Sequence, residues 1–319
     1  MGRLETRPFS DEFVGAAGEL LAARHRAQRS VEPLLPAAYE DPAAARAEIE
    51  ALAATEGASG AVALREDLVV GYLLGAPRTD DVWGPNVWVE LAGHAVEEAE
   101  DLRDLYADAA GRWLEEERPR HYALVPESDY ALVEAWFRLS FGQQHAFGIR
   151  EVPENITWPD DVRRAEPRDV DALVALTPVL GDHQARAPVF SRGHLPEDPD
   201  ELRADILADL GKKEIAELVA IRGGEMVGAI ETVPVEMSST HTGLARPPGA
   251  VLLAWAATLP GVRGSGAGRA LTEATFAWAH ERGHEIIVTD WRVTNLLASR
   301  FWPSRGFRPT FLRLYRHIP

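Results

Sequence analysis

The feature that most constrains this chain is an apolar segment that ends in a basic, glycine-dense turn. Residues 253–269 read Leu-Ala-Trp-Ala-Ala-Thr-Leu-Pro-Gly-Val-Arg-Gly-Ser-Gly-Ala-Gly-Arg. The apolar part predicts a strand over 251–259, and the amphipathic part that follows predicts a helix from about Ala270 to Arg282. A glycine turn between a strand and a helix is typical of a phosphate site, because free amides of the first helical turn point at the anion.

Two familiar glycine motifs do not fit this turn. A kinase-type P-loop needs Lys followed by Ser or Thr after its last glycine, but Arg269 is followed by Ala270 and Leu271. A dinucleotide fingerprint needs the spacing G-x-G-x-x-G, whereas the glycines here stand at every second position from 264 to 268. Judged by itself, the turn leaves open a phosphate loop of another kind or a glycine-rich turn without a ligand.

A second motif lies downstream and narrows these alternatives. The β-branched run 285–290 predicts a short strand. The segment after it resembles the pattern N-x-x-A-x-x-F-Y-x-x-x-G-F of the GNAT superfamily of N-acetyltransferases, through Asn295, Ala298, Phe301, Trp302, Gly306 and Phe307. The glycine turn resembles the R-x-x-G-x-G/A pyrophosphate loop of the same superfamily, with its fixed positions at Arg263, Gly266 and Gly268. Two motifs in the family order give the resemblance, which covers residues from about 163 to 319.

The resemblance implies acetyl-CoA, or another acyl-CoA, as co-substrate, with no metal. The strand before the loop would be splayed from its neighbour, so that its free edge pairs with the pantetheine arm. The pyrophosphate would lie on the loop amides, and Asn295 would contact the far arm of the coenzyme, although Asn295 also suits a helix N-cap. The coenzyme-binding residues implied in this way are Ala256, Ala257, Thr258, Arg263, Gly264, Ser265, Gly266, Ala267, Gly268, Arg269, Asn295 and Trp302.

Direct transfer of an acetyl group to an amine needs a base for the ammonium proton and a proton source for the thiolate. Asp290 is the first candidate base, because it ends a predicted strand five residues before Asn295, a spacing found in some relatives; a surface carboxylate is the alternative. Glu231 is the second candidate, because an acid inside an apolar strand is unexpected; an outward-facing strand residue is the alternative. Trp302 stands where the family often has tyrosine, and its indole N–H donates a hydrogen bond but no proton. Trp302 therefore orients the thiolate or only packs, and Tyr315 or water is the alternative proton source.

The chain also contains a repeat. Positions of the second motif recur in the first half at a constant shift of 166 residues, as in 295 minus 129, 302 minus 136 and 307 minus 141. The runs 61–75 and 218–230 each predict two strands joined by a turn. We therefore predict a mixed α/β fold with two GNAT-like domains, over 1–152 and 163–319. Each would have a mostly antiparallel sheet, a splayed parallel pair and flanking helices.

The two predicted domains differ at the phosphate loop. The counterpart of the loop in the first half is Glu-Glu-Ala-Glu-Asp-Leu at 97–102, which has four acids and no glycine. Carboxylates facing a pyrophosphate are unfavourable, and side chains would cover the amides. The first domain is therefore predicted to be degenerate, with no coenzyme loop.

Composition limits the partners. With 33 basic and 50 acidic residues the formal net charge is −17, which disfavours nucleic acid and anionic membranes and mildly favours a cationic amine. The absence of cysteine excludes disulfides and cysteine nucleophiles. No long apolar stretch or secretory signal is apparent, so a cytoplasmic location is expected. The resemblance implies a small-molecule or peptide amine as acceptor, and a monomer and a homodimer both remain open.

Two alternatives remain from the sequence. One is an acyl-CoA-binding regulatory protein without catalysis, which the missing tyrosine and the uncertain base would fit. The other is a zinc metallohydrolase, because His280-Glu281-Arg-Gly-His284 matches H-E-x-x-H. Gly283 argues against zinc, since it predicts that the helix ends before His284. The acceptor is expected to be selected by the segment from about Thr177 to Leu195.

Overall fold

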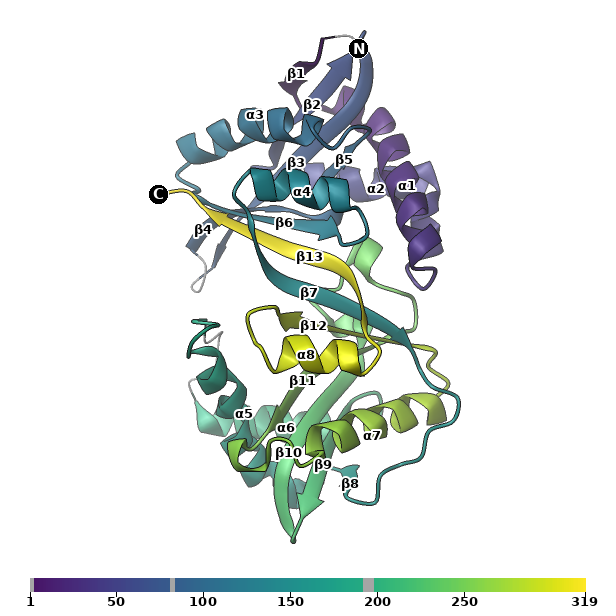
Figure 1. The fold of residues 1–319 in the computed structure, drawn as a ribbon, viewed down its shortest axis with the longest axis vertical. Helices are drawn as coiled ribbons and strands as arrows, with labels where there is room; N and C mark the ends of the chain where they lie inside the picture. Colours follow the sequence, from purple (N-terminus) through teal and green to yellow (C-terminus); the bar gives the residue numbers. More distant parts are fainter. Residues whose placement is uncertain (1–2, 81–83, 192–197) are drawn as a thin grey trace. The chain divides into compact units, whose positions relative to one another are not determined.

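The structure is a computed structural model, and it describes residues 3–80, 84–191 and 198–319. The chain divides into two compact units (Figure 1). Unit 1 comprises Met1–Phe147, Thr242–Arg246 and Pro309–Pro319, and unit 2 comprises Gly148–His241 and Pro247–Arg308. Within the described ranges, no helix combines the length and the apolar character needed to cross a membrane.

Unit 1 is built on a sheet with the strand order β1-β2-β3-β4-β6-β13, and β5 pairs with β3. Its neighbours are antiparallel except for the parallel pair β4 and β6. The strands are β1 (Glu5–Pro8), β2 (Ser59–Arg65), β3 (Leu68–Asp80), β4 (Gly84–Val89), β5 (His94–Val96), β6 (Arg120–Pro126) and β13 (Arg308–His317). The helices are α1 (Val14–Val31), α2 (Pro42–Ala53), α3 (Asp101–Glu115) and α4 (Tyr130–Arg138). Strand β7 (Gly142–Glu151) leads from unit 1 into unit 2.

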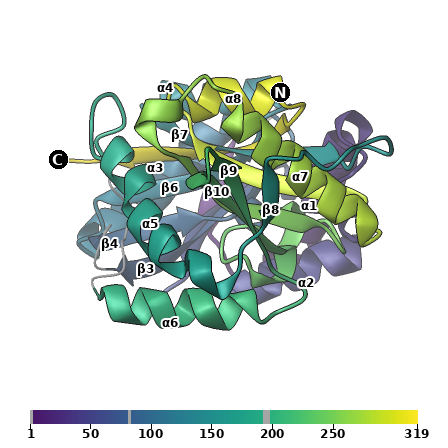
Figure 2. The ribbon, with the colours of Figure 1, turned by 90° about the horizontal axis from the view of Figure 1, so that it is seen from below.

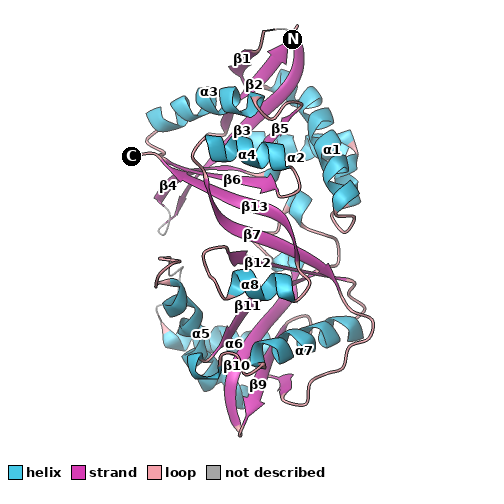
Figure 3. Cartoon of the chain, viewed as in Figure 1, coloured by secondary structure: helices cyan, strands magenta, loops and turns pink. Residues whose placement is uncertain are grey.

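Unit 2 repeats this plan with the strand order β12-β11-β10-β9-β8, in which only β11 and β12 are parallel. The strands are β8 (Val162–Arg164), β9 (Ala216–Arg222), β10 (Glu225–Pro234), β11 (Val251–Thr258) and β12 (Ile286–Arg292). The helices are α5 (Val170–Gln184), α6 (Pro199–Leu210), α7 (Ala267–Glu281) and α8 (Ala298–Ser304). The predicted mixed α/β class, with two units of one sheet plan, is confirmed (Figure 3).

The compact units differ from the predicted domains in three segments. Residues 148–152 lie in unit 2, where the amide of Val152 donates to the Glu285 carbonyl at 2.9 Å. Residues 242–246 and 309–319 lie in unit 1. The last difference follows from strand pairing, because β13 is antiparallel to β6 from Phe311, opposite Pro126, to His317, opposite Arg120. A repeat read along the sequence cannot show that its last strand completes the sheet of the first unit.

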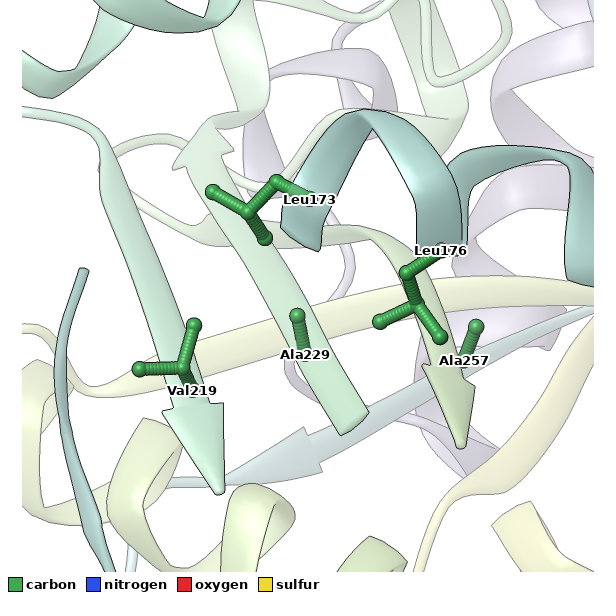
Figure 4. Packing of buried hydrophobic residues seen from close by; sticks show 5 residues of the cluster. All are labelled: Leu173, Leu176, Val219, Ala229 and Ala257. Atoms are coloured by element: carbon green, nitrogen blue, oxygen red, sulfur yellow. The ribbon is translucent and has the colours of Figure 1, made fainter. Parts of the chain in front are cut away.

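Helices of unit 2 cover the sheet with small and branched apolar side chains. Figure 4 shows Leu173 and Leu176 of α5 directed at Val219, Ala229 and Ala257, which come from β9, β10 and β11. Ile206 of α6 joins the edge of this cluster, and α7 packs against β9, β10 and β11 (Figure 2). This packing fixes β11 and the start of α7, which carry the glycine turn between them.

The helix after the glycine turn begins earlier than predicted. It starts at Ala267 instead of Ala270, because Gly266 has φ 91° and takes the N-cap position. Gly268 and Arg269 therefore belong to the first helical turn. Glycine disfavours a helix interior but is tolerated at its first turn, where amides have no intrahelical acceptor.

Candidate functional site

Strands β11 and β12 separate soon after they meet. Their parallel register holds only at Val251, opposite Ile287, and Leu252, opposite Val288, although both strands continue beyond these pairs. The hydroxyl of Thr289 donates to the Leu253 carbonyl at 3.1 Å, where the strands diverge. A backbone edge of β11 therefore faces a gap rather than a neighbouring strand, as the splay implied by the resemblance requires.

A β-bulge lies at the same point on the other edge of β11. Glu231 of β10 is opposite Trp255 and Thr232 is opposite Leu253, so Ala254 has no opposing residue. Ala254 is exposed, although the residues of β11 before it are buried. Bulges bend a strand and redirect its groups, and this one does so beside the gap.

The glycine turn follows β11 and presents an open helix N-terminus. Gly264 and Gly266 have φ of 80° and 91°, values that a residue with a Cβ adopts only with strain. Gly266 has no side chain to cap α7, so the amides of the first turn are left for an external acceptor. The helix dipole and the exposed Arg263 and Arg269 favour an anion at this place.

Ser265 was predicted to bind the coenzyme, but its polar groups have partners within the protein. Its amide already donates to the Val262 carbonyl at 3.1 Å. Its hydroxyl and carbonyl oxygens accept hydrogen bonds from Arg222 Nη1 at 2.6 and 2.9 Å. Ser265 therefore anchors the turn, and the amides available to a ligand are those of its neighbours.

Asn295 serves as a helix cap and also borders the gap. Its Oδ1 accepts from the amides of Leu297 and Ala298 at 3.2 and 3.3 Å, at the start of α8. The same oxygen lies 3.2 Å from Nε2 of His183, so this ring nitrogen carries the proton. The Nδ2 amide group of Asn295 is the part of its side chain suited to donate to a ligand. The two roles expected for Asn295 are therefore compatible.

A cavity of about 450 Å³ in unit 2 joins these features, a volume ordinary for a ligand site. It lies among α5, the diverging strands, the glycine turn, the first turn of α7 and α8. Of the predicted coenzyme and base residues, all line it except Ser265 and Glu231. The predicted residues that line it are Ala256, Ala257, Thr258, Arg263, Gly264, Gly266, Ala267, Gly268, Arg269, Asp290, Asn295 and Trp302.

Several lining residues on α5 were not assigned to the coenzyme or to the base from the sequence. Val179, Leu180, His183 and Gln184 come from the segment that was expected to select the acceptor, and Gln184 accepts from Arg292 Nε at 3.2 Å. They line the same cavity as the glycine turn. The residues of that segment from 192 to 195 lie outside the described residues.

Trp302 is packed as well as cavity-lining. It is 8% exposed, and its ring meets those of Phe301 and Phe307 edge-on, at centroid distances of 4.9 and 5.6 Å. Tyr315, the alternative proton donor, belongs to unit 1, where its ring lies 4.9 Å from that of Tyr122. The cavity-lining residues all belong to unit 2, and Tyr315 is not one of them.

Glu231 belongs to a carboxylate pair on the sheet face covered by α5 and α6. It stands directly opposite Glu217 on β9. Burial, then Glu231, then Asp209 raise the pKa of Glu217 to about 8. Burial and Asp209 also raise the pKa of Glu231, against the lowering effect of Lys212. The pair therefore retains a proton at neutral pH, as expected for two half-buried carboxyl groups side by side.

This pair makes stability depend on pH. Between pH 4.5 and about 8 an unfolded chain releases the Glu217 proton while the folded protein keeps it, so stability falls as pH rises. We expect Glu217→Gln to remove that fall and to raise Tm relative to wild type by about 3 °C or more at pH 8, with a smaller effect at pH 5. Thermal unfolding at both pH values checks this. Glu151→Gln should lower Tm by a similar amount at both pH values, because Arg308 lowers the pKa of Glu151 and the stabilisation it gives is lost only below the ordinary carboxyl range. A Tm difference that is equal at both pH values for Glu217→Gln would contradict the assignment.

The H-E-x-x-H segment does not form a two-histidine helix face. Helix α7 ends at Glu281, and Gly283 has φ 73°, so His284 lies beyond the helix that carries His280. His284 Nδ1 lies 3.0 Å from the Gly249 carbonyl, and its ring stacks on Trp278. Among the described residues, no group of three His, Cys, Asp or Glu side chains is arranged to hold a metal. The arrangement that zinc hydrolysis requires is therefore not produced by this motif.

The corresponding place in unit 1 is filled by side chains of the unit itself. Asp101, the first residue of α3, accepts two hydrogen bonds from Arg65, at 2.6 and 2.7 Å. Where β4 ends, the buried guanidinium of Arg24 donates to the carbonyls of His94 and of Leu91, the latter at 2.7 Å.

His94 also fills this place in unit 1 with its side chain. Burial and Arg24 lower its pKa to about 3, so the ring is neutral, and Nε2 donates to the Leu124 carbonyl at 2.8 Å. In unit 2 the backbone after the divergence of β11 and β12 faces a gap. In unit 1 the carbonyls of Leu91 and His94, just after β4, are bound instead by Arg24. That unit 1 holds no coenzyme in the equivalent place stays a prediction.

Comparisons with known proteins agree with this geometry. Residues 183–307 match the sequence model of the Acetyltransferase (GNAT) family. No curated protein sequence matches the chain. Among solved structures, a GCN5-related N-acetyltransferase from Sphaerobacter thermophilus is 14% identical with a TM-score of 0.56, over 98% of this chain and 95% of that one.

Two further structures are similar. A glucosamine N-acetyltransferase region in a fungal multi-domain beta-N-acetylglucosaminidase is 13% identical with a TM-score of 0.53, over 99% of this chain and 38% of that one. A tandem GNAT protein from the clavulanic acid biosynthesis pathway is 16% identical with a TM-score of 0.49, over 99% and 98%. At such identities, the structure from Sphaerobacter thermophilus and the fungal region show only that this chain shares their fold. The chain thus shares its fold with the Sphaerobacter thermophilus and fungal structures, and its residues 183–307 match the family of GNAT acetyltransferases.

Proposed function

We propose that this protein is an acetyl-CoA-dependent N-acetyltransferase that acetylates a primary amine of a small molecule or peptide within a ternary complex. The GNAT match over residues 183–307 supports acyl-CoA-dependent acetyl transfer in general. The observation that carries the specific proposal is one continuous cavity that runs from the splayed edge of β11 to the uncapped N-terminus of α7.

The two ends of this cavity suit the two ends of acyl-CoA. The amides of Gly264, Gly266 and the first turn of α7, together with Arg263 and Arg269, would hold the pyrophosphate. The free backbone of Ala256, Ala257 and Thr258 would pair with the amides of the pantetheine arm, because a strand edge offers alternating donors and acceptors. Asn295 would donate through Nδ2. All of these residues line the cavity. Ser265 is the one predicted coenzyme-binding residue that does not.

Asp290 is the proposed base for the acceptor. It lies on β12 beyond the divergence from β11 and lines the cavity. In the proposed reaction the Asp290 carboxylate takes one proton from the ammonium, and the neutral amine attacks the thioester carbonyl. A C–N bond forms, the C–S bond breaks, the nitrogen gives up its second proton to solvent water, and the products are an amide and the thiolate of CoA. Glu231 is the second candidate, through a water, because burial and Asp209 raise its pKa, which makes it a stronger base than an ordinary carboxylate.

The thiolate does not require an acidic side chain in this scheme. Thiols ionise near pH 8.5, so a thiolate can leave and then take a proton from water near neutral pH. Trp302 can donate an indole hydrogen bond toward sulfur but supplies no proton. Its tight contact with Phe301 and Phe307 would hold it in one orientation.

Binding and turnover can be tested separately. We expect acetyl-CoA to raise the Tm of the full chain, because a ligand that binds only the folded state stabilises it. A panel of amines, including diamines and peptides, would then be assayed for release of CoA thiol with a thiol reagent. A Tm shift without thiol release from any amine favours the alternative of a non-catalytic acyl-CoA-binding protein. If acetyl-CoA changes neither Tm nor calorimetric heat, both functions are wrong.

A further inference from the structure

Arg222 links the glycine turn to the segment that joins the two repeats. It is the last residue of β9, and its Nη1 donates to the hydroxyl and carbonyl oxygens of Ser265. Its Nε and Nη2 both donate to Asp161 Oδ2 at 3.0 Å. Asp161 is fixed in turn, because its carbonyl accepts from the Ile221 amide at 2.8 Å. One guanidinium thus spans Asp161 and Ser265, a geometry that its planar array of donors permits.

The position of Arg222 is close to the ligand-facing part of the turn. Its Nη2 lies 3.9 Å from the place that a Cβ on Gly266 would occupy. The side chains of Arg222 and Asp161 are 31% and 34% exposed. An ion pair this exposed adds little to the stability of the fold, so its main effect is on the conformation of what it holds, the turn at Ser265.

Unit 1 provides an internal comparison. Arg65 is the last residue of β2, as Arg222 is of β9, in the aligned runs Ala-Val-Ala-Leu-Arg and Leu-Val-Ala-Ile-Arg. Arg65 binds Asp101, the first residue of α3, so a carboxylate occupies that helix N-terminus. In unit 2 the carboxylate partner is Asp161, outside the helix, and the arginine holds a serine of the turn instead. The arginine at this strand end therefore helps to close the helix N-terminus in unit 1, whereas its counterpart in unit 2 leaves the helix N-terminus open.

We propose that Arg222 is a positioning residue for acyl-CoA binding: held by Asp161, it fixes Ser265 and keeps the glycine turn in the conformation that presents its amides to the pyrophosphate. This inference rests on the proposed function, since it assumes that the turn binds CoA. It differs from a role of Arg222 as a mere positive charge near the phosphates. The two roles give opposite expectations when the charge of Asp161 is removed.

The test is calorimetric titration of the full chain with coenzyme A at fixed salt. Asp161→Asn leaves Arg222 charged and uncompensated, so a purely electrostatic role predicts tighter binding. The positioning role predicts weaker binding, by about three- to tenfold for Asp161→Asn and about tenfold or more for Arg222→Ala, the range expected for loss of charge-assisted hydrogen bonds. Arg222→Lys should restore only part of the loss, because one ammonium cannot span both partners.

Glu151→Gln is the matched control. Glu151 is ion-paired with Arg308 in the same unit at 2.8 Å, so the change removes the same charge without touching Ser265, and CoA affinity should stay within about twofold. For active preparations, the KM for acetyl-CoA should rise in Asp161→Asn and Arg222→Ala while kcat stays near wild type. Unchanged or tighter CoA binding by Asp161→Asn, with a wild-type Tm, overturns the proposal. Failure of the wild-type chain to bind CoA would instead count against the proposed function.

Discussion

Gly266→Glu is expected to abolish acetyl-CoA binding, with a loss of at least about 100-fold in affinity. Three effects act together. A side chain at φ 91° is strained, which distorts the turn. The carboxylate covers the open N-terminus of α7 and takes the place that the pyrophosphate needs. Its negative charge repels the pyrophosphate, which alone costs several kcal/mol when two anions are held at about 4 Å near a protein surface. Calorimetric titration with acetyl-CoA measures the loss.

Gly249→Glu is the control that separates blocking of the coenzyme site from the general effects of an added charge and a strained backbone. Gly249 also has a left-handed conformation, with φ 69°, and open space around its Cβ position, but it does not line the cavity. This control introduces the same charge and the same backbone strain in unit 2, and we expect it to bind acetyl-CoA as wild type does. The wild-type stoichiometry should be one per chain, and Gly266→Glu should show no residual site in unit 1. Tight binding that survives Gly266→Glu would place the coenzyme elsewhere.

Asp290→Asn is expected to lower kcat for the amine substrate by about 100-fold or more, the range that removal of a general base produces. The amide is almost the same size as the carboxylate, so the cavity and the KM for acetyl-CoA should change little. The loss should therefore fall on the chemical step, because the ammonium proton has no acceptor. Steady-state assays of thiol release with saturating acetyl-CoA measure it.

Glu231→Gln distinguishes the two candidate bases. Glu231 does not line the cavity, and its side chain lies on the face with Glu217. If Asp290 is the base, Glu231→Gln should retain most of the wild-type kcat between pH 6 and 9. A wild-type kcat for Asp290→Asn together with a large loss for Glu231→Gln would transfer the role to the β10 carboxylate.

Local signals explain why much of unit 2 could be predicted. The glycine-dense turn was predicted to lie between a strand and a helix, and it does, with Gly264 and Gly266 in left-handed backbone conformations. The apolar run at 251–259 and the amphipathic run after the turn predict β11 and α7, and each forms within a few residues of the prediction. Asn295 followed by Leu-Leu-Ala predicts a cap, and its Oδ1 binds the amides of Leu297 and Ala298. In each case the physical cause lies within a few residues of the signal.

Other parts of the site depend on residues far apart in the chain. The interaction of Arg222 with Asp161 and Ser265 joins three separate segments, and nothing in the local sequence of any one of them indicates it. His183 reaches Asn295 across 112 residues. Glu217 and Glu231 form a pair only because the β9–β10 hairpin places them opposite each other, and their raised pKa values follow from that burial.

The sequence by itself determined a mixed α/β chain with two related halves, and it located the glycine turn, the helix behind it and the Asn295 motif. The strand, the turn and the helix follow from backbone preference and periodicity, which act between near neighbours; the Asn295 motif was located by its resemblance to the GNAT pattern, and the two halves by the repeat of that pattern. Only the tertiary structure decided that β11 and β12 separate after two residue pairs, that the C-terminal strand joins the sheet of unit 1, and that Arg222 holds the turn. These depend on strand pairing and side-chain contacts between distant segments, which only folding brings together.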